Sequence, residues 1–265
     1  MITEFQDGFI TKTKLNELVG GINDIDSNIL TADITKTVGS GGDFLTLNLA
    51  INWCKKLTPN GYKVTISIIG GTIIQESLIF KNVDLRFVEI ISSDSSVVTV
   101  DGNYLTPNYI PAFAPFIYSE NSVFPKISFK SILINEPLTS NGIYIYSEIK
   151  SEIHLNDNVS ISGFPFGIRV MAGSTLIANS IDILDGFQGI LAFNSRVDAL
   201  YSNISSTSLG VYSAQMSHIN AVGCKCPNAK SGFQVGDGGF ISCRDSTGTL
   251  YQTANTITAN GIIFQ

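Results

Sequence analysis

Apolar and polar residues alternate in short segments that recur along the second half of the chain. One of these segments opens with a glycine in every repeat, at spacings of 25, 22, 21 and 22: Gly142, Gly167, Gly189, Gly210 and Gly232. Alternate residues of a β-strand point to opposite faces, so each segment can bury one row of side chains. A period of about 22 residues is typical of a solenoid, in which every repeat forms one coil.

Two further segments recur with the same period. The second begins with "SEIHL" at Ser151, and the third, which is weaker, begins with "VSI" at Val159. Three short strands per repeat predict an all-β fold, a right-handed parallel β-helix of about seven or eight coils. One inward column follows the glycines: Ile143, Ile168, Ile190, Val211 and Phe233. A second lies at the centre of the second segment: Ile153, Leu176, Val197, Ile219 and Ile241.

The segment Gly39–Leu57 has the pattern of an amphipathic helix, with Asp43 as its candidate N-cap. Its apolar face consists of residues at helical spacing: Leu47, Ala50, Ile51, Cys54 and Leu57. The open end of a solenoid exposes apolar side chains and unpaired backbone groups. We therefore expect this helix to cover the first coil.

A short heptad pattern precedes the helix, with spacings of 3, 4, 3 and 4: Leu15, Leu18, Ile22, Ile25 and Ile29. It indicates either a coiled coil of more than two chains or one amphipathic helix packed on its own chain. The chain is accordingly divided into an N-terminal attachment and trimerisation segment (1–36), a capped β-helix (37–250) and a C-terminal end segment (251–265).

Charge and hydropathy narrow the possible partners. The net charge is −6 and no basic cluster is present, which argues against nucleic acid as a partner. No apolar run reaches the roughly 18 residues that a membrane span requires, so no membrane insertion is expected. The N-terminus carries early acidic residues and lacks the apolar stretch of a secretory signal, so we expect synthesis in the cytoplasm of the host cell.

Three of the four cysteines, Cys224, Cys226 and Cys243, fall at inward positions of the repeat. There a free thiol packs as a small apolar group. Cys224 and Cys226 also form a Cys-x-Cys pair that leaves a metal site open as an alternative, but no histidine lies at metal-ligand spacing. We therefore predict no disulfide, no metal and no other cofactor.

Candidate catalytic residues lie on the outward side of the second segment. Arg196 and Asp198 share a face about 7 Å apart, and His218 lies one coil further, about 4.8 Å away. Together with Glu152 on the same face, these side chains can bind an acidic sugar and transfer a proton. The alternative is a solvated ladder of charges that prevents wrong strand pairing. Two carboxylate pairs are weaker candidates for a glycosidase site, Asp182 with Asp185 and Glu148 with Glu152.

The outward side of the first segment is mostly apolar and carries one charge, Arg169. We call this set of residues the outer stripe: Tyr144, Tyr146, Met171, Leu191, Phe193 and Tyr212. A stripe so apolar is not expected to face water undisturbed. We interpret it as a subunit interface in preference to a platform for sugar rings.

The segment Asp101–Pro125 breaks the period. It contains four prolines and six aromatic residues, which predicts a long loop. Its Tyr104, Tyr109 and Tyr118 each combine an apolar ring with a polar tip. They are the candidate residues for gripping a glycan.

Two stretches of the sequence resemble a known family. "TVGSGGDFLTLNLAI", Thr37 to Ile51, resembles the segment that caps the pectin-lyase-like β-helix of bacteriophage tail fibres and tailspikes. "NTITANGIIFQ", Asn255 to Gln265, resembles the last residues of tail fibres from phages of Gram-negative bacteria. The resemblance implies a homotrimer in the virion tail that is joined to a tail or baseplate protein near its N-terminus. It also implies that the β-helix meets host surface polysaccharide.

Two functions remain open at this stage. One is a tail fibre that binds host polysaccharide without cleaving it, and the other is a capsule or O-antigen depolymerase, either a glycoside hydrolase or a polysaccharide lyase. Pectin methylesterases have a related opening, but their Gln-Asp-Thr, Val-Asp-Phe-Ile-Phe-Gly and Gly-Arg-Pro-Trp motifs do not occur in this chain. We expect the binding fibre, because no carboxylate pair in the sequence is convincing.

Overall fold

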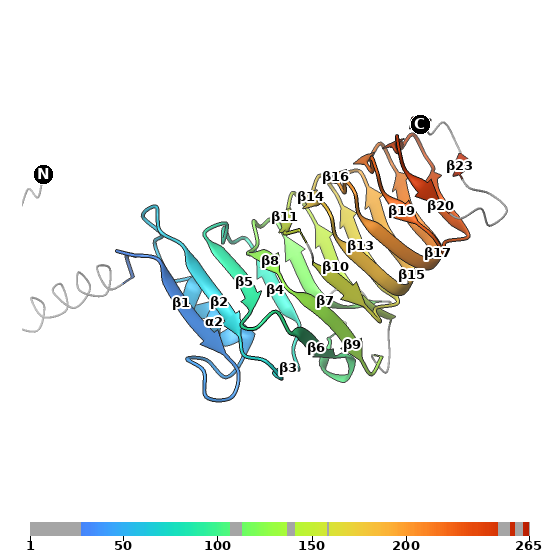
Figure 1. Ribbon diagram of the computed structural model, residues 1–265. Helices are drawn as coiled ribbons and strands as arrows, with labels where there is room; N and C mark the ends of the chain where they lie inside the picture. The colour runs from blue at the N-terminus through green and yellow to red at the C-terminus, as the bar shows by residue number, and fades with distance from the viewer. Residues whose placement is uncertain are drawn as a thin grey trace, which may run out of the picture.

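The chain forms coils of parallel strands that are stacked along one long axis (Figure 1). The computed structural model describes residues 28–106, 113–136, 141–157, 159–248, 255–257 and 262–264. The N-terminal strands lie at one end of the stack and the C-terminal strands at the other (Figure 1). The strands form long parallel sheets, so the fold is all-β and of the parallel β-helix type, as the repeat predicts.

One face of the stack is a ten-stranded sheet, to which each coil adds one strand. Its strands lie in the order β1 (Ile34–Val38), β2 (Val64–Ile68), β5 (Val88–Ser92), β8 (Lys126–Ser128), β11 (Glu152–Leu155), β14 (Thr175–Ala178), β16 (Arg196–Asp198), β18 (His218–Asn220), β21 (Phe240–Ser242) and β24 (Ile262–Phe264). The seven or eight coils that the sequence predicts are therefore too few. The irregular first coils conceal their period in the sequence.

The other strands form a fourteen-stranded sheet that bends around the stack. One arm contains β3 (Ile73–Ile74), β6 (Val97–Asp101), β9 (Lys130–Ile134) and β12 (Ser160–Ser162); the other contains β4 (Leu78–Lys81), β7 (Phe113–Glu120), β10 (Asn141–Glu148) and β13 (Phe166–Met171). The long strands β15 (Asp182–Phe193) and β17 (Asn203–Ala214) pass from one arm to the other. Beyond β17 the arms continue as β19 (Lys225–Cys226), β20 (Ser231–Val235), β22 (Thr247–Gly248) and β23 (Asn255–Ile257).

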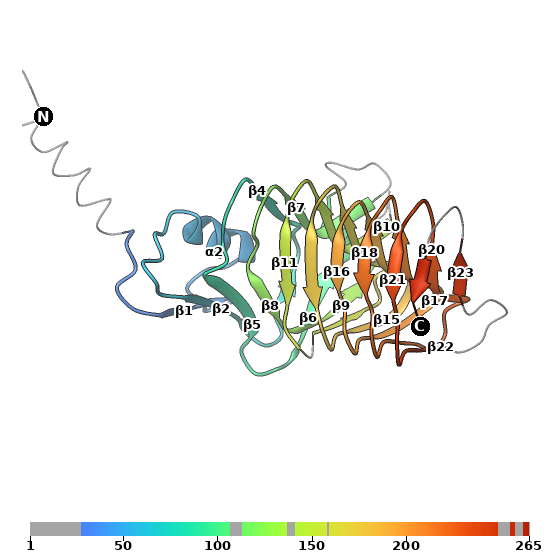
Figure 2. The ribbon, with the colours of Figure 1, turned by 90° about the horizontal axis from the view of Figure 1, so that it is seen from above.

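The predicted inward column at the centre of the second segment is confirmed. Its five residues are in register from β11 to β21 and are fully buried. The residues on either side of each member point outward, as the alternation predicts. Figure 2 shows the coils wound around this shared interior.

The predicted first inward column is wrong at its first member. Ile143 pairs with Phe166, and Ile145 is the residue in register with Ile168. Tyr144 therefore occupies the position of Gly167, and its ring is fully buried between Phe116 and Phe164. The spacing between the first two glycines is longer than the others because Gly142 does not belong to the glycine column.

Close approach between coils requires the glycine column. A Cβ atom on Gly167 would lie 2.7 Å from the carbonyl oxygen of Gly189, and a Cβ on Gly210 would lie 2.5 Å from that of Gly232. Gly189 is closed in by Ile204 and by the carbonyl of Gly210. The earlier coils carry Phe116 and Tyr144 at this position, so the interior is wider there.

The predicted capping helix is present as α2 (Leu47–Cys54), which packs on β1 and β2 at the N-terminal end of the stack (Figure 2). Its apolar face is buried as predicted: Leu47, Ala50, Ile51 and Cys54. The predicted N-cap is wrong. Thr46 caps the helix by accepting a hydrogen bond from the backbone of Leu49, whereas Asp43 accepts hydrogen bonds from Thr37 and Lys36.

The predicted loop at Asp101–Pro125 is largely wrong. Its second half contains β7, which pairs with β4 and β10 inside the fourteen-stranded sheet. Six consecutive residues of β7, Ala114 to Ser119, are buried. A strand that is covered on both faces lacks the alternation by which strands are recognised in a sequence, and the proline and aromatic residues of β7 then suggest a loop.

Strands continue across both segment boundaries drawn from the sequence. Residue 37 lies inside β1, so the coils begin before the predicted boundary. In the C-terminal segment, β23 and β24 pair with β20 and β21 and thus continue both sheets. The predicted interface residues Leu15, Ile22 and Ile25 lie outside the described residues.

All four cysteines are free and buried. Burial raises the pKa of the thiols of Cys54 and Cys224 to about 12. Cys224 lies in the column of Ile181 and Ser202, as predicted. These thiols pack as core residues and stay protonated near neutral pH.

Gly189→Ala is expected to lower the free energy of unfolding by about 3 kcal/mol, because the new methyl group overpacks a closed interior. Gly41→Ala is the control. Its methyl group meets nothing within 4 Å and introduces only the strain of a φ of +80°, about 1 kcal/mol. Denaturant unfolding of both variants measures the difference. Equal losses would contradict the close approach of the coils at Gly189.

Asp43 is expected to make the N-terminal end of the stack sensitive to acid. The hydrogen bonds from Lys36 and Thr37 lower the pKa of Asp43 from 3.8 to about 2. A lowered pKa stabilises the folded chain above pH 4, and this contribution disappears as the pH falls toward 2. Asp43→Asn is therefore expected to unfold at a lower temperature than the wild type at pH 6 and to approach it at pH 2. A difference that is constant with pH would exclude this linkage.

Candidate functional site

The outward side of the ten-stranded sheet carries two polar columns, as predicted. One column contains Glu152, Thr175, Arg196, His218 and Phe240, and the other contains His154, Ile177, Asp198, Asn220 and Ser242. The register also extends the second column backward. Because Ile127 pairs with Leu155, Lys126 of β8 stands opposite His154 of β11.

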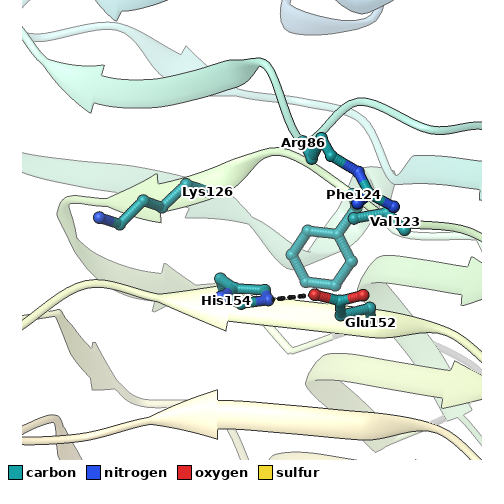
Figure 3. Close-up of a pocket in the computed structure, with 6 residues that line it drawn as sticks. All are labelled: Arg86, Val123, Phe124, Lys126, Glu152 and His154. Atoms are coloured by element: carbon teal, nitrogen blue, oxygen red, sulfur yellow. Dashed lines mark hydrogen bonds and ion pairs between the residues drawn. The ribbon is translucent and has the colours of Figure 1, made fainter.

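A pocket of about 260 Å³ opens where these columns meet the earlier coils. We call it the β8–β11 pocket; it is lined by Arg86, Val123, Phe124, Lys126, Glu152 and His154 (Figure 3). The Phe124 side chain is buried and forms the apolar floor. The polar groups come from three coils: the turn before β5, the start of β8 and the outward side of β11.

Glu152 and His154 form a close pair on β11. Nε2 of His154 lies 2.6 Å from Oε1 of Glu152, and both side chains are partly exposed. With a proton on Nε2, the imidazole donates to the carboxylate and is held in place by it. Nδ1 then carries the free lone pair, so the pair has the form of an oriented general base.

Two cations flank this pair. Arg86 donates through Nε to Asp84 over 3.0 Å. This hydrogen bond raises the pKa of Arg86, and the charge of Glu152 raises it further. Lys126 is exposed and makes no ion pair within the described part of the chain, and its ammonium group points away from Glu152 (Figure 3). A ligand carboxylate that entered here would find positive charge on two sides.

The structure brings together three of the four predicted catalytic residues. Arg196 is paired in register with His218, and its guanidinium lies 3.4 Å from the carboxylate of Asp198. Glu152 lies apart from them, because β14 separates β11 from β16. Two strand spacings amount to about 9.6 Å, and Asp198 is also two residues further along its strand than the residue in register with Glu152. The pair thus exceeds the separation of about 5 to 9.5 Å in glycosidases.

One member of each weaker carboxylate pair makes a hydrogen bond to a residue outside the pair. Asp185 accepts a hydrogen bond from Ser162 at the bend of β15. Glu148 lies beside Glu120 in the register of β10 and β7, and the hydroxyl of Tyr118 lies 2.9 Å and 3.1 Å from their carboxylates. Lys81 forms an ion pair with Glu120. Glu148 is thereby bound to the fourteen-stranded sheet and not to Glu152.

The predicted glycan-gripping tyrosines do not form one group. Tyr104 ends a short 3₁₀ helix and is half exposed, which is compatible with a ligand contact. Tyr118 lies on β7 and is only 2% exposed, so it is not available to stack on a sugar. Tyr109 lies outside the described residues.

The outer stripe is less exposed than its sequence suggests. Tyr144 points into the core, so it does not belong to the outer stripe. Tyr146 and Leu191 are buried, Tyr146 against Tyr118 and Met171. Met171, Phe193 and Tyr212 are partly exposed. Three of the six residues that predict a subunit interface are thus buried within the chain, and the other three are partly exposed.

Arg86 and Lys126 are functional candidates that the sequence does not reveal. Both belong to the early coils, where no clear period assigns residues to columns. The only signal is the interval between Lys126 and His154 along the chain, which is longer than one repeat. The pairing of neighbouring strands places both residues at the pocket, and their separation along the chain does not predict this.

No group of three or more histidine, cysteine, aspartate or glutamate side chains that could hold a metal occurs among the described residues. Among the same residues, no helix is both long and apolar enough to cross a membrane. Comparisons of the chain with protein-family models, curated proteins and solved structures found no match.

Proposed function

We propose that this chain is a tail-fibre or tailspike component of a bacteriophage virion that binds host cell-surface polysaccharide. Its fold is then a right-handed, pectin-lyase-like parallel β-helix. The resemblance of Thr37–Ile51 and Asn255–Gln265 to that family supports the identity. The right hand is supported by the strong preference of parallel strands in one sheet for right-handed connections.

The β8–β11 pocket is the observation that carries the binding function. It combines the acceptor Glu152, the donor His154 and the cations Arg86 and Lys126 around a buried phenyl ring. Specific ligand sites commonly join an apolar surface to a few convergent polar groups. Sugars offer matching hydroxyl groups, and acidic sugars add a carboxylate for the cations.

The proposed assembly is a homotrimer that joins a tail or baseplate protein through its N-terminal segment. Exposed aliphatic side chains favour one face of the coils for contact with a second copy. They lie on β3, β6 and β9, neighbours in the fourteen-stranded sheet: Ile73, Val97, Ile132 and Ile134, each between 36% and 51% exposed. We call these residues the aliphatic patch. Exposed apolar clusters of this kind are typical of contact surfaces.

The alternative function is a depolymerase, and the pocket favours a polysaccharide lyase over a glycoside hydrolase. A lyase removes the proton from the carbon that bears a uronate carboxylate. The bond to the 4-oxygen then breaks, the oxygen leaves with the electron pair, and a carbon–carbon double bond forms. Nδ1 of His154 would accept the proton, while Arg86 would neutralise the carboxylate. No second carboxylate is required, unlike in a glycosidase.

Replacing both pocket cations, Arg86→Ala with Lys126→Ala, is expected to weaken binding of host capsular polysaccharide at least tenfold, about 1.4 kcal/mol. The matched control is Lys225→Ala with Arg244→Ala, which removes the same charge from two exposed positions outside the candidate sites. We expect the control to change affinity less than twofold. Biolayer interferometry with immobilised polysaccharide measures both variants.

Equal weakening by the control would show general attraction to charge and would refute a specific pocket. The same samples are tested for cleavage by the appearance of reducing or unsaturated ends. We expect binding without cleavage. Unsaturated ends that disappear with His154→Ala would establish the lyase instead, and cleavage abolished by Asp198→Asn with assembly intact would establish catalysis at the downstream column.

Light scattering is expected to give three times the chain mass of 28.5 kDa. Ile132→Ser with Ile134→Ser is expected to shift the protein toward monomer, because both side chains are exposed on β9. The matched control is Phe193→Ser with Tyr212→Ser, which lies on the outer stripe and is expected to leave the mass unchanged. A lower mass in the control variant alone would indicate that the outer stripe is the interface. A stable wild-type monomer would refute the trimer.

A further inference from the structure

Arg169 stands at the centre of a ring of aromatic side chains on the fourteen-stranded sheet. It lies on β13, in register with Tyr146 of β10 and Leu191 of β15. Its guanidinium carbon is 4.8 Å from the ring centre of Phe193, 5.4 Å from that of Phe113 and 5.6 Å from that of Tyr146. Three cation–π contacts on one side chain hold it in a defined position.

No carboxylate neutralises this cation within the described part of the chain. Its Nε atom is shielded from solvent and has no hydrogen-bond partner there. The nearby acidic residues are engaged elsewhere: Glu120 and Glu148 share the hydroxyl of Tyr118, and Lys81 pairs with Glu120. An aromatic face stabilises positive charge but does not satisfy the five N–H donors of a guanidinium.

The surroundings define the ligand that would complete the site. Arg169, Phe193 and Tyr212 are partly exposed, and the last two rings meet edge to face with their centres 5.6 Å apart. A planar carboxylate fits the outer edge of the guanidinium through two parallel hydrogen bonds. An apolar face attached to that carboxylate would lie against the rings. A uronate-type sugar has both features.

We call the three rings around Arg169 its aromatic collar: Phe113, Tyr146 and Phe193. We propose that Arg169 and this collar bind the carboxylate of an acidic sugar residue. They would form a second glycan site on a different sheet from the β8–β11 pocket. The proposal deepens the proposed glycan-binding function and names its substrate class, an acidic polysaccharide. Arg169 supplies the charge recognition. Phe193 and Tyr212 supply the surface for the sugar ring.

The test uses the full chain and two probes, a glucuronate-containing oligosaccharide and the same oligosaccharide with its carboxyl groups reduced to alcohols. We expect the wild type to bind the acidic probe at least tenfold more tightly. Arg169→Gln should abolish this preference, and Arg169→Lys should restore only part of it, because an ammonium group lacks the planar fork. Arg244→Gln, the same change at a highly exposed position outside both proposed sites, should leave the preference intact.

A second measurement does not depend on overall affinity. The chain has four arginines, so side-chain nitrogen spectra of labelled protein resolve few signals, and Arg169→Lys identifies the one that belongs to Arg169. The acidic probe should shift that signal and the reduced probe should not. This result would stand even if the host polysaccharide itself failed to bind, which would refute only the proposed function.

Three outcomes would overturn the site. The Arg169 signal does not move with the acidic probe, the preference survives in Arg169→Gln, or Arg169→Gln changes the oligomeric state with no effect on probe binding. The last result would make this face a subunit contact. Near-ultraviolet circular dichroism checks that each variant keeps its packed aromatic core.

Discussion

The register with which each coil pairs with the next is the constraint on which every surface site depends. Ile127 pairs with Leu155, and this pairing alone sets Lys126 opposite His154. A slip of one residue in either strand would turn the polar side chain of that strand into the core, since alternate residues of a strand face opposite ways. The buried columns resist such a slip, because it would also expose their aliphatic members to water.

The side chains that fill the interior differ between the early and the later coils, and the same strands carry the outward rings near Arg169. The early coils hold Phe116 and Tyr144 where the later coils hold a column of glycines that starts at Gly167. The same strands, β7 and β10, place Phe113 and Tyr146 on the outside, where they meet Arg169. The wide interior therefore lies behind two rings of the aromatic collar, while its third ring, Phe193, comes from the glycine-lined strand β15.

The two sheets present charge in different ways. On the ten-stranded sheet, acids and bases neighbour one another, as in the pair Arg196 and Asp198 and in the pair Glu152 and His154. Exposed pairs of this kind contribute little to stability, so substitutions in these columns are expected to leave the fold intact. On the fourteen-stranded sheet the Arg169 guanidinium is packed among three aromatic rings. Its Nε donor is buried without a partner among the described residues, and an unpaired buried donor carries a cost in free energy.

The sequence by itself determined the all-β solenoid, the capping helix and the column of Ile153, because period and alternation are local properties of the chain. It misplaced Tyr144 and Tyr118 and did not reveal Arg86 or Lys126. Strands buried on both faces lose their alternation, and the irregular early coils carry no period from which a column can be assigned. Only the pairing of coils across the tertiary structure decided which side chains meet, because the distance between neighbouring coils is set by hydrogen bonds and packing and not by separation along the chain.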